Sequence, residues 1–144
     1  MIDRRSLIAG AAALAAAPAF AGQRRRRTGA RPIGIQLYTL RELFQKDPAA
    51  TLATLARIGY REIEYGGGGY DQMDAAMLRR TADKLGLKAP SAHIAYEALS
   101  ADFAGSVRRA KTLGIDTVVI PYLIDPLRNE TAFAKVVADM NAWA

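Results

Sequence analysis

The chain has 144 residues, enough for one domain. It is 51% hydrophobic and 24% charged, which excludes a disordered body, and it has no cysteine, which excludes disulfides and thiolate metal sites. The net charge is +6, but seven of the 20 basic and one of the 14 acidic residues precede Pro32, so thirteen of each follow it. A nucleic-acid-binding domain would carry a basic face of its own, so this neutral body argues against a nucleic-acid partner.

Residues 1–21 have the three parts of an export signal. Arg4 and Arg5 form a charged start, an apolar run occupies 7–17, and the last three residues, 19–21, are a small-x-small cleavage site. The string Asp-Arg-Arg-Ser-Leu-Ile around the two arginines resembles a twin-arginine signal, so we expect export to the periplasm by that pathway. An ordinary secretory leader and an uncleaved anchor are the alternatives.

The segment that follows the signal, residues 22–31, contains the arginine run Arg24–Arg27. We interpret it as a solvated basic arm. The apolar run of the signal is too short to cross a bilayer as a stable helix, so we expect no membrane span after cleavage.

The first predicted strand, 32–38, is a near-continuous apolar run, typical of a strand buried on both faces. Further strands are predicted at 61–65, 88–93 and 117–120.

Helices are predicted between and after these strands from apolar residues at helical spacing. Asp47-Pro48 is a strong helix start, a second helix covers about 74–85, and the last begins at Asn129 or Thr131. The predicted inner stripes are Leu52, Leu55 and Ala56; Leu78, Ala82 and Leu85; Phe103, Val107 and Ala110; and Phe133, Val136, Val137 and Met140.

Three glycines mark the junctions between these helices and strands. Gly59, Gly86 and Gly114 recur at intervals of 27 and 28 residues, each closing a helix-like stretch and preceding a strand-like one. The residue after a helix usually needs positive φ, which glycine adopts without a clash. The pattern predicts four successive βα units with a parallel sheet.

Four βα units suit either half of a (βα)₈ barrel or a small doubly wound sheet. A barrel takes roughly 250 residues, and the next glycine of the series would fall near residue 142. We therefore expect the body, 32–144, to be an incomplete array, truncated in its fourth helix.

Polar residues gather at the carboxyl ends of the predicted strands, where both folds bind ligands. Several of them occur at i, i+2, so each pair can point to the same side of its strand. They are Gln36 and Tyr38, Glu62 and Glu64, Ser91 and His93, and Tyr122.

Gly66–Gly69 form a four-glycine loop at the same ends. The loop lacks the lysine and spacing of a phosphate-binding loop, so we interpret it as a flexible loop.

Three strand-end motifs, Ile33–Arg41, Gly59–Tyr65 and Ala89–His93, resemble the xylose isomerase-like sugar phosphate isomerase/epimerase family, in particular its exported members. The resemblance covers about 33–144. It implies a TIM-type barrel, of which this chain is the N-terminal half, and the isomerisation or epimerisation of a sugar.

The resemblance also implies a divalent metal, Mn²⁺, Zn²⁺ or Mg²⁺. In the family the metal ligands lie on the last four strands, so none maps onto a residue of this chain. The residues that carry over are substrate-binding: Gln36 and Tyr38 by the first motif, Glu64 by the second and His93 by the third. Tyr122 is added from its place after strand four, and no catalytic residue is assigned.

The leading hypothesis is the N-terminal part of a metal-dependent sugar isomerase or epimerase, inactive by itself. The first alternative is a carbohydrate-binding half-barrel without chemistry, in one version a dimer that rebuilds a barrel. A less favoured one is a relative of the abasic-site endonucleases.

Because a half-barrel leaves open sheet edges and apolar faces, we expect residues 22–144 expressed alone to aggregate, dimerise or stay partly molten.

Overall fold

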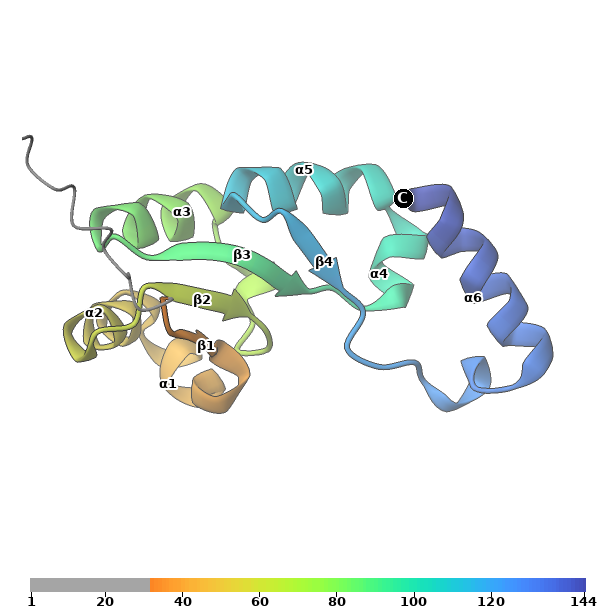
Figure 1. Cartoon of the computed structure of the whole chain (residues 1–144), viewed down its shortest axis with the longest axis horizontal. Coiled ribbons are helices and arrows are strands. Elements are labelled where there is room, and N and C mark those ends of the chain that lie inside the picture. Colours follow the sequence, from red (N-terminus) through yellow and green to blue (C-terminus); the bar gives the residue numbers. More distant parts are fainter. Residues whose placement is uncertain (1–31) are drawn as a thin grey trace, which may run out of the picture. The chain divides into compact units, whose positions relative to one another are not determined.

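Four short parallel strands form one sheet in the chain order β1-β2-β3-β4 (Figure 1). The computed structural model describes residues 32–144, so the expected export signal, 1–21, and basic arm, 22–31, lie outside the described residues. The strands are β1 Gly34–Gln36, β2 Glu62–Tyr65, β3 Lys88–His93 and β4 Thr117–Val119. The four predicted strands are confirmed.

The first strand is shorter and more open than predicted. It ends at Gln36, where the chain turns into the 3-10 helix η1, Leu37–Leu40. Ile33 is 70% exposed, so the expectation of a strand buried on both faces is wrong. Helices cover one face of β1 and no described element covers the other.

The four predicted helices are present and two further ones accompany them. The helices are α1 Arg41–Lys46, α2 Pro48–Ile58, α3 Ala75–Lys84, α4 Tyr96–Ala101, α5 Phe103–Leu113 and α6 Glu130–Trp143, with 3-10 turns η2 at Tyr70–Gln72 and η3 at Asp125–Leu127. The two that the sequence did not predict, α1 and α4, have six residues each. That length is too short to show helical periodicity.

Local side chains set where the longer helices begin. Asp47, Asp74, Asp102 and Asn129 each accept a backbone N–H from the first turn of the helix that follows, at 2.8–3.1 Å. Such caps satisfy N–H groups that have no partner within the helix. At the other ends, the three spaced glycines adopt φ of 120°, 67° and 77°, as predicted.

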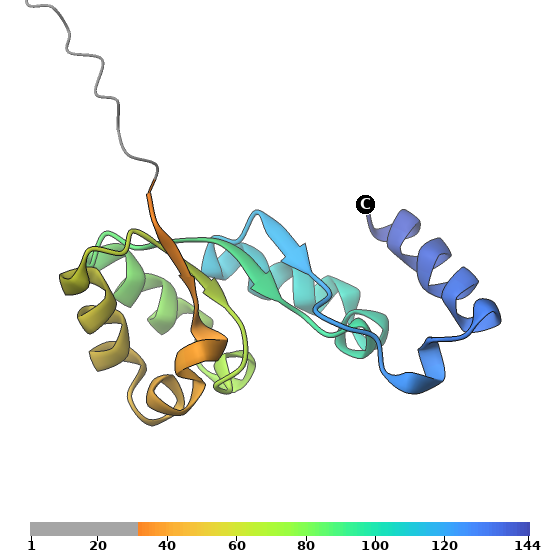
Figure 2. The ribbon, with the colours of Figure 1, turned by 60° about the horizontal axis from the view of Figure 1, so that its bottom comes forward.

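The two faces of the sheet differ in character. Along β2, Ile63 and Tyr65 are 1% and 0% exposed and belong to the core, whereas Glu62 and Glu64 are half-buried on the opposite face. Figure 2 shows the strands on one side and α1, α2, α3 and α5 on the other. The main helix residues of the core are Phe44, Leu52, Leu55, Leu78, Ala82, Ala110 and Leu113.

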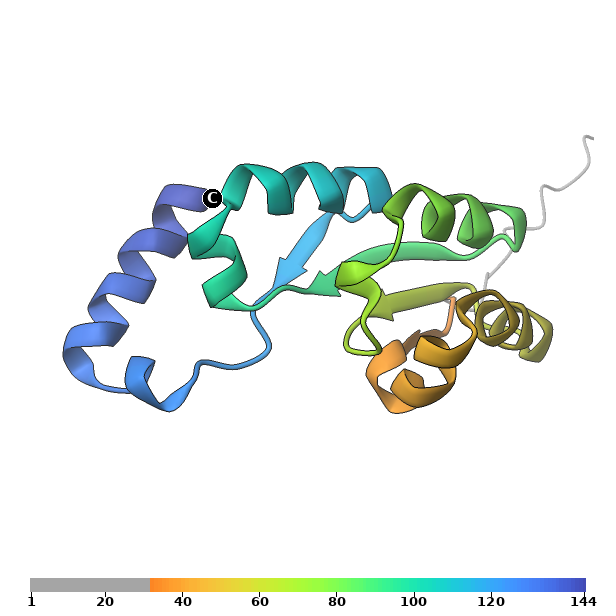
Figure 3. The same cartoon turned by 180° about the vertical axis from the view of Figure 1, so that it is seen from behind.

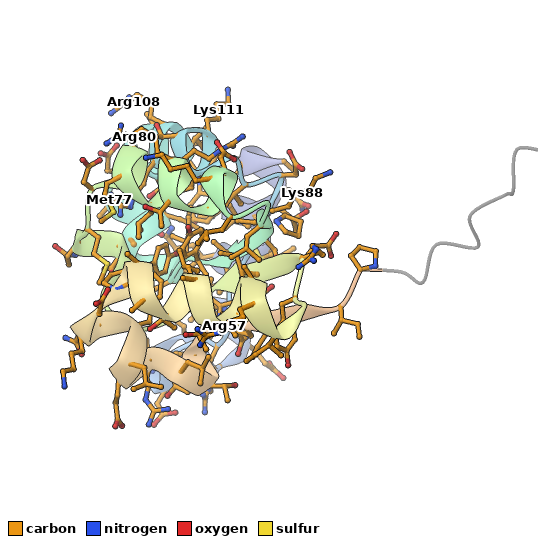
Figure 4. The ribbon with its side chains drawn as sticks, turned by 90° about the vertical axis from the view of Figure 1, so that its left-hand side faces the viewer. Arg57, Met77, Arg80, Lys88, Arg108 and Lys111 are labelled. Carbon is orange, nitrogen blue, oxygen red and sulfur yellow. The ribbon has the colours of Figure 1, made fainter. Side chains whose placement is uncertain are left out.

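The outer sides of the helices are polar. Figure 4 shows Arg80 on α3 with Arg108 and Lys111 on α5, pointing away from the sheet into solvent. No helix within residues 32–144 is long and apolar enough to cross a membrane.

The last helix, α6, is less buried than its apolar stripe predicts. Only Val136 is buried, while Phe133, Val137 and Met140 are 54%, 42% and 47% exposed. α6 lies beside α4 and the start of α5, at the other end of the sheet from α2 (Figures 1 and 3), where Trp143 stacks on Phe103 at 5.5 Å between ring centroids. Within residues 32–144 no strand pairs with the outer edge of β4, and no described element covers the exposed residues of the α6 stripe.

The four-glycine loop passes close to η1 and α1. Gly67, Gly68 and Gly69 all have φ between 65° and 69°. A Cβ on Gly68 would lie 2.9 Å from the backbone oxygen of Arg41, and one on Gly67 would lie 2.8 Å from the ring of Tyr38. The loop needs glycine because its backbone passes so close to η1 and α1.

We expect Leu78→Ala to lower the free energy of unfolding by about 2–5 kcal/mol, because it leaves a cavity at a side chain that is 0% exposed. Leu43→Ala, at a helix position that is 60% exposed, should change it by less than about 0.5 kcal/mol. Urea unfolding followed by circular dichroism measures both. Equal effects would contradict the core described above.

Gly68→Ala and Gly69→Ala separate backbone strain from crowding. Both place an alanine at positive φ, which costs about 1–2 kcal/mol, but a Cβ at Gly69 meets nothing within 4 Å. Gly68→Ala should therefore lower the free energy of unfolding by about 1–3 kcal/mol more than Gly69→Ala does, because its Cβ also crowds the backbone oxygen of Arg41. The same urea titrations test this, and equal losses would show that the loop moves aside.

Candidate functional site

Three polar side chains lie in one row across the sheet. Gln36 pairs in register with Glu64, and Glu64 pairs with Ser91, so the three occupy corresponding positions on β1, β2 and β3. His93 lies two residues after Ser91, at the end of β3. Alternation along the strands places all four on the face that the helices do not cover.

The four side chains form a continuous hydrogen-bonded network. The amide Nε2 of Gln36 donates to Oε1 of Glu64 at 2.6 Å, and Oγ of Ser91 donates to Oε2 of Glu64 at 2.5 Å. Nε2 of His93 lies 3.2 Å from Oε1 of Glu64 and 3.0 Å from Nε2 of Gln36. Each carboxylate oxygen of Glu64 thus has at least one partner.

The His93 ring has two ways to join this network. A neutral ring with its proton on Nδ1 accepts the second amide hydrogen of Gln36 at Nε2. A ring protonated at Nε2 donates to Glu64 instead. In either state both carboxylate oxygens of Glu64 keep a donor, from Gln36 and from Ser91.

Glu64 is ionised at neutral pH. Hydrogen bonds from Ser91 and Gln36 hold the pKa of this carboxyl below its ordinary value of 4.5, in that order of size, and His93 lowers it further. Partial burial opposes them, since the side chain is 25% exposed. A carboxylate with a lowered pKa is a good hydrogen-bond acceptor and a weak base.

A cleft of about 820 Å³ adjoins the network, and Gln36 and His93 line it. Tyr38 and Tyr122 line the same cleft but are 53% and 62% exposed. No hydrogen bond within residues 32–144 joins either tyrosine to the network; the ring of Tyr38 lies under Arg41 instead, 4.9 Å from its guanidinium carbon. The structure thus brings together three of the five predicted residues and places the other two at the mouth.

Sequence reasoning left three residues of this region without a role. Ser91 stands at i, i+2 with His93, which is a usable signal, but only the sheet register reveals its bond to Glu64. Tyr70 and Arg109 also line the cleft. Their contacts join residues 23 to 39 positions apart, and no local pattern marks them.

The described residues do not fit the divalent metal that the family resemblance implies. Within residues 32–144 no group of three or more His, Asp or Glu side chains could hold a metal ion. Glu64 and His93 are adjacent but already hydrogen-bonded, and a protein metal site usually needs three or four ligands. We assign no metal ligand to these residues.

The lowered pKa of Glu64 predicts a pH-dependent contribution to stability. A carboxyl with a lowered folded-state pKa stabilises the fold above its ordinary value of 4.5, and this contribution is lost as the pH falls below it. Glu64→Gln should therefore lower the free energy of unfolding by roughly 1–2 kcal/mol at pH 7, and its difference from the unsubstituted chain should shrink between pH 4.5 and pH 3.

Urea unfolding at several pH values measures this difference. Glu62→Gln is the matched control, because Glu62 lies on the same strand and face but forms none of the hydrogen bonds of the network. A Glu64→Gln difference that stays constant from pH 7 to pH 3 would contradict the assignment.

Comparison with known proteins supports the fold. No protein-family model and no curated protein matches the chain. Among solved structures it is similar to a sugar phosphate isomerase/epimerase from Parabacteroides distasonis, with a TM-score of 0.57 and 24% sequence identity. The match covers 80% of this chain and 46% of the other, so the chain spans about half the length of the structure it matches. Residues 32–144 therefore have the architecture of a TIM-type half-barrel, the predicted fold class.

Proposed function

We propose that this chain forms the sugar-binding half of a TIM-type isomerase or epimerase that acts on a sugar or sugar phosphate. The observation that carries the proposal is the network of Gln36, Glu64, Ser91 and His93 at the carboxyl ends of three parallel strands, beside an 820 Å³ cleft. Ligands bind at these strand ends in TIM barrels. The description of the similar solved structure and the three sequence motifs support the same class.

The network suits a ligand with several hydroxyl groups. Glu64 presents an ionised carboxylate, Gln36 an amide, and His93 a ring that can donate or accept. Each can exchange a partner within the network for a sugar hydroxyl at little cost, because a hydrogen bond replaces a hydrogen bond. These residues would orient the substrate.

The proposed reaction moves a proton between carbons of the sugar. A base removes the proton next to the carbonyl, giving an enediolate, and the proton returns to the neighbouring carbon or to the other face. Glu64 is a weak base because of its lowered pKa, and no residue of 32–144 is assigned the role of the base. A divalent metal would stabilise the enediolate oxygen, and its ligands too are left unassigned.

A second candidate is a protein that binds carbohydrate without transforming it. Binding needs only the hydrogen-bonding network, and all four of its side chains lie within residues 32–144. The two candidates make the same prediction for binding by this chain and opposite ones for catalysis by the complete protein.

Ligand-observed NMR with the full chain tests binding against a panel of aldoses, ketoses and their phosphates. Gln36→Ala should weaken the binding of the best ligand about tenfold or more, since each lost hydrogen bond in a charged network is worth about 1.5 kcal/mol or more. Gln45→Ala, at an exposed position of α1 outside the cleft, is the matched control. If no sugar binds, or Gln36→Ala binds as the unsubstituted chain does, the proposal fails.

Solvent exchange then separates the two candidates. With Mn²⁺ present in deuterium oxide, the complete isomerase or epimerase to which this half would belong, purified from its source, should incorporate deuterium at the carbon next to the carbonyl and stop doing so in chelator. Binding that continues in chelator, with no deuterium incorporated under either condition, would favour the non-catalytic candidate for this chain.

A further inference from the structure

The carbonyl group of His93 lies beyond the last pair of strands β2 and β3. The final residue of β2, Tyr65, pairs in register with Ala92. His93 is one residue further along, so β2 has no residue left beside it. On the other side, His93 pairs with Val119, the last residue of β4, and the N–H of Ile94 donates to the carbonyl of Val119 at 3.0 Å.

A tyrosine from the next loop supplies the missing partner. The hydroxyl of Tyr70 donates to the carbonyl oxygen of His93. Tyr70 is 6% exposed, and its ring stacks on that of Tyr65 with centroids 5.3 Å apart. Burial raises the pKa of Tyr70 to about 12, so the hydroxyl keeps its proton at neutral pH and acts as a donor.

Helix α5 in turn holds Tyr70. Nη2 of Arg109 donates to the carbonyl oxygens of Tyr70 and Met73, the latter at 2.7 Å. The Nε of Arg109 is buried and has no partner within the described residues. The two contacts of Nη2 thus tie α5 to the first residue of η2 and to the residue that follows it.

We propose that Tyr70 and Arg109 are positioning residues of the candidate site. Arg109 fixes the turn that carries Tyr70, and Tyr70 fixes the end of β3, so that the His93 ring stays within reach of Gln36 and Glu64. The role of the site in sugar binding rests on the proposed function, but the positioning itself does not need a ligand.

The chain offers a direct probe, because His93 is its only histidine. Long-range ¹H–¹⁵N spectra of the full chain, labelled with ¹⁵N-histidine and carrying no histidine tag, report the two nitrogens of this ring alone. At pH 7 we expect Tyr70→Phe to shift both ring nitrogens toward the values of free histidine. Arg109→Lys should shift them in the same direction, because a lysine cannot make both contacts with the guanidinium geometry.

Two controls define the scale of the effect. Tyr96→Phe removes a hydroxyl of similar burial, 5% exposed and hydrogen-bonded to Asp139, and should leave the ring signals unchanged. Gly66→Ala places a methyl group 3.3 Å from Nδ1 of His93 and should move the ring signals directly.

The proposal is overturned if Gly66→Ala shifts the ring signals while Tyr70→Phe leaves them in place, whatever either does to stability. Should circular dichroism show Tyr70→Phe unfolded, Arg109→Lys decides by the same criterion. Because no sugar is present in this experiment, its failure and the failure of the sugar-binding test are independent results.

Discussion

The alternation of side chains along the central strand β2 is the constraint on which the rest of the structure depends. Successive residues of a strand face opposite sides of a sheet. Ile63 and Tyr65 therefore enter the helix-covered core, and Glu64 takes the other face together with Gln36 and His93. The same backbone geometry that buries the core thus gathers the polar network, and a shift of one residue in register would bury the carboxylate and expose the tyrosine.

The network combines a rigid row with a less well supported end. Gln36, Glu64 and Ser91 stand on three paired strands, so the hydrogen bonds of the sheet fix their spacing. His93 has strand support on one side only. Precise placement of a functional group needs support from a second layer of contacts, and in this structure the loop after β2 and helix α5 provide it.

The outcome for individual residues shows where sequence reasoning works and where it stops. The helix start at Asp47 and the positive φ of Gly114 were predictable, because each depends on the few residues around it. The packing of Gly68 against Arg41 was not, since it joins a loop of one βα unit to a helix of another. The exposure of Phe133 was also missed, because an apolar stripe shows which side of a helix avoids water but not whether a partner covers it.

The sequence by itself determined the βα order, the starts of α2, α3 and α6, and the residue types at the strand ends. These features depend on caps, glycines and side-chain periodicity, whose range is about a helical turn or two. Only the tertiary structure decided which polar residues meet. The bonds of Glu64 to Gln36 and Ser91 join residues 28 and 27 positions apart, and that of Tyr70 to His93 joins residues 23 apart. Such contacts follow from strand register and helix docking, which depend on the packing of the whole core and not on any local pattern.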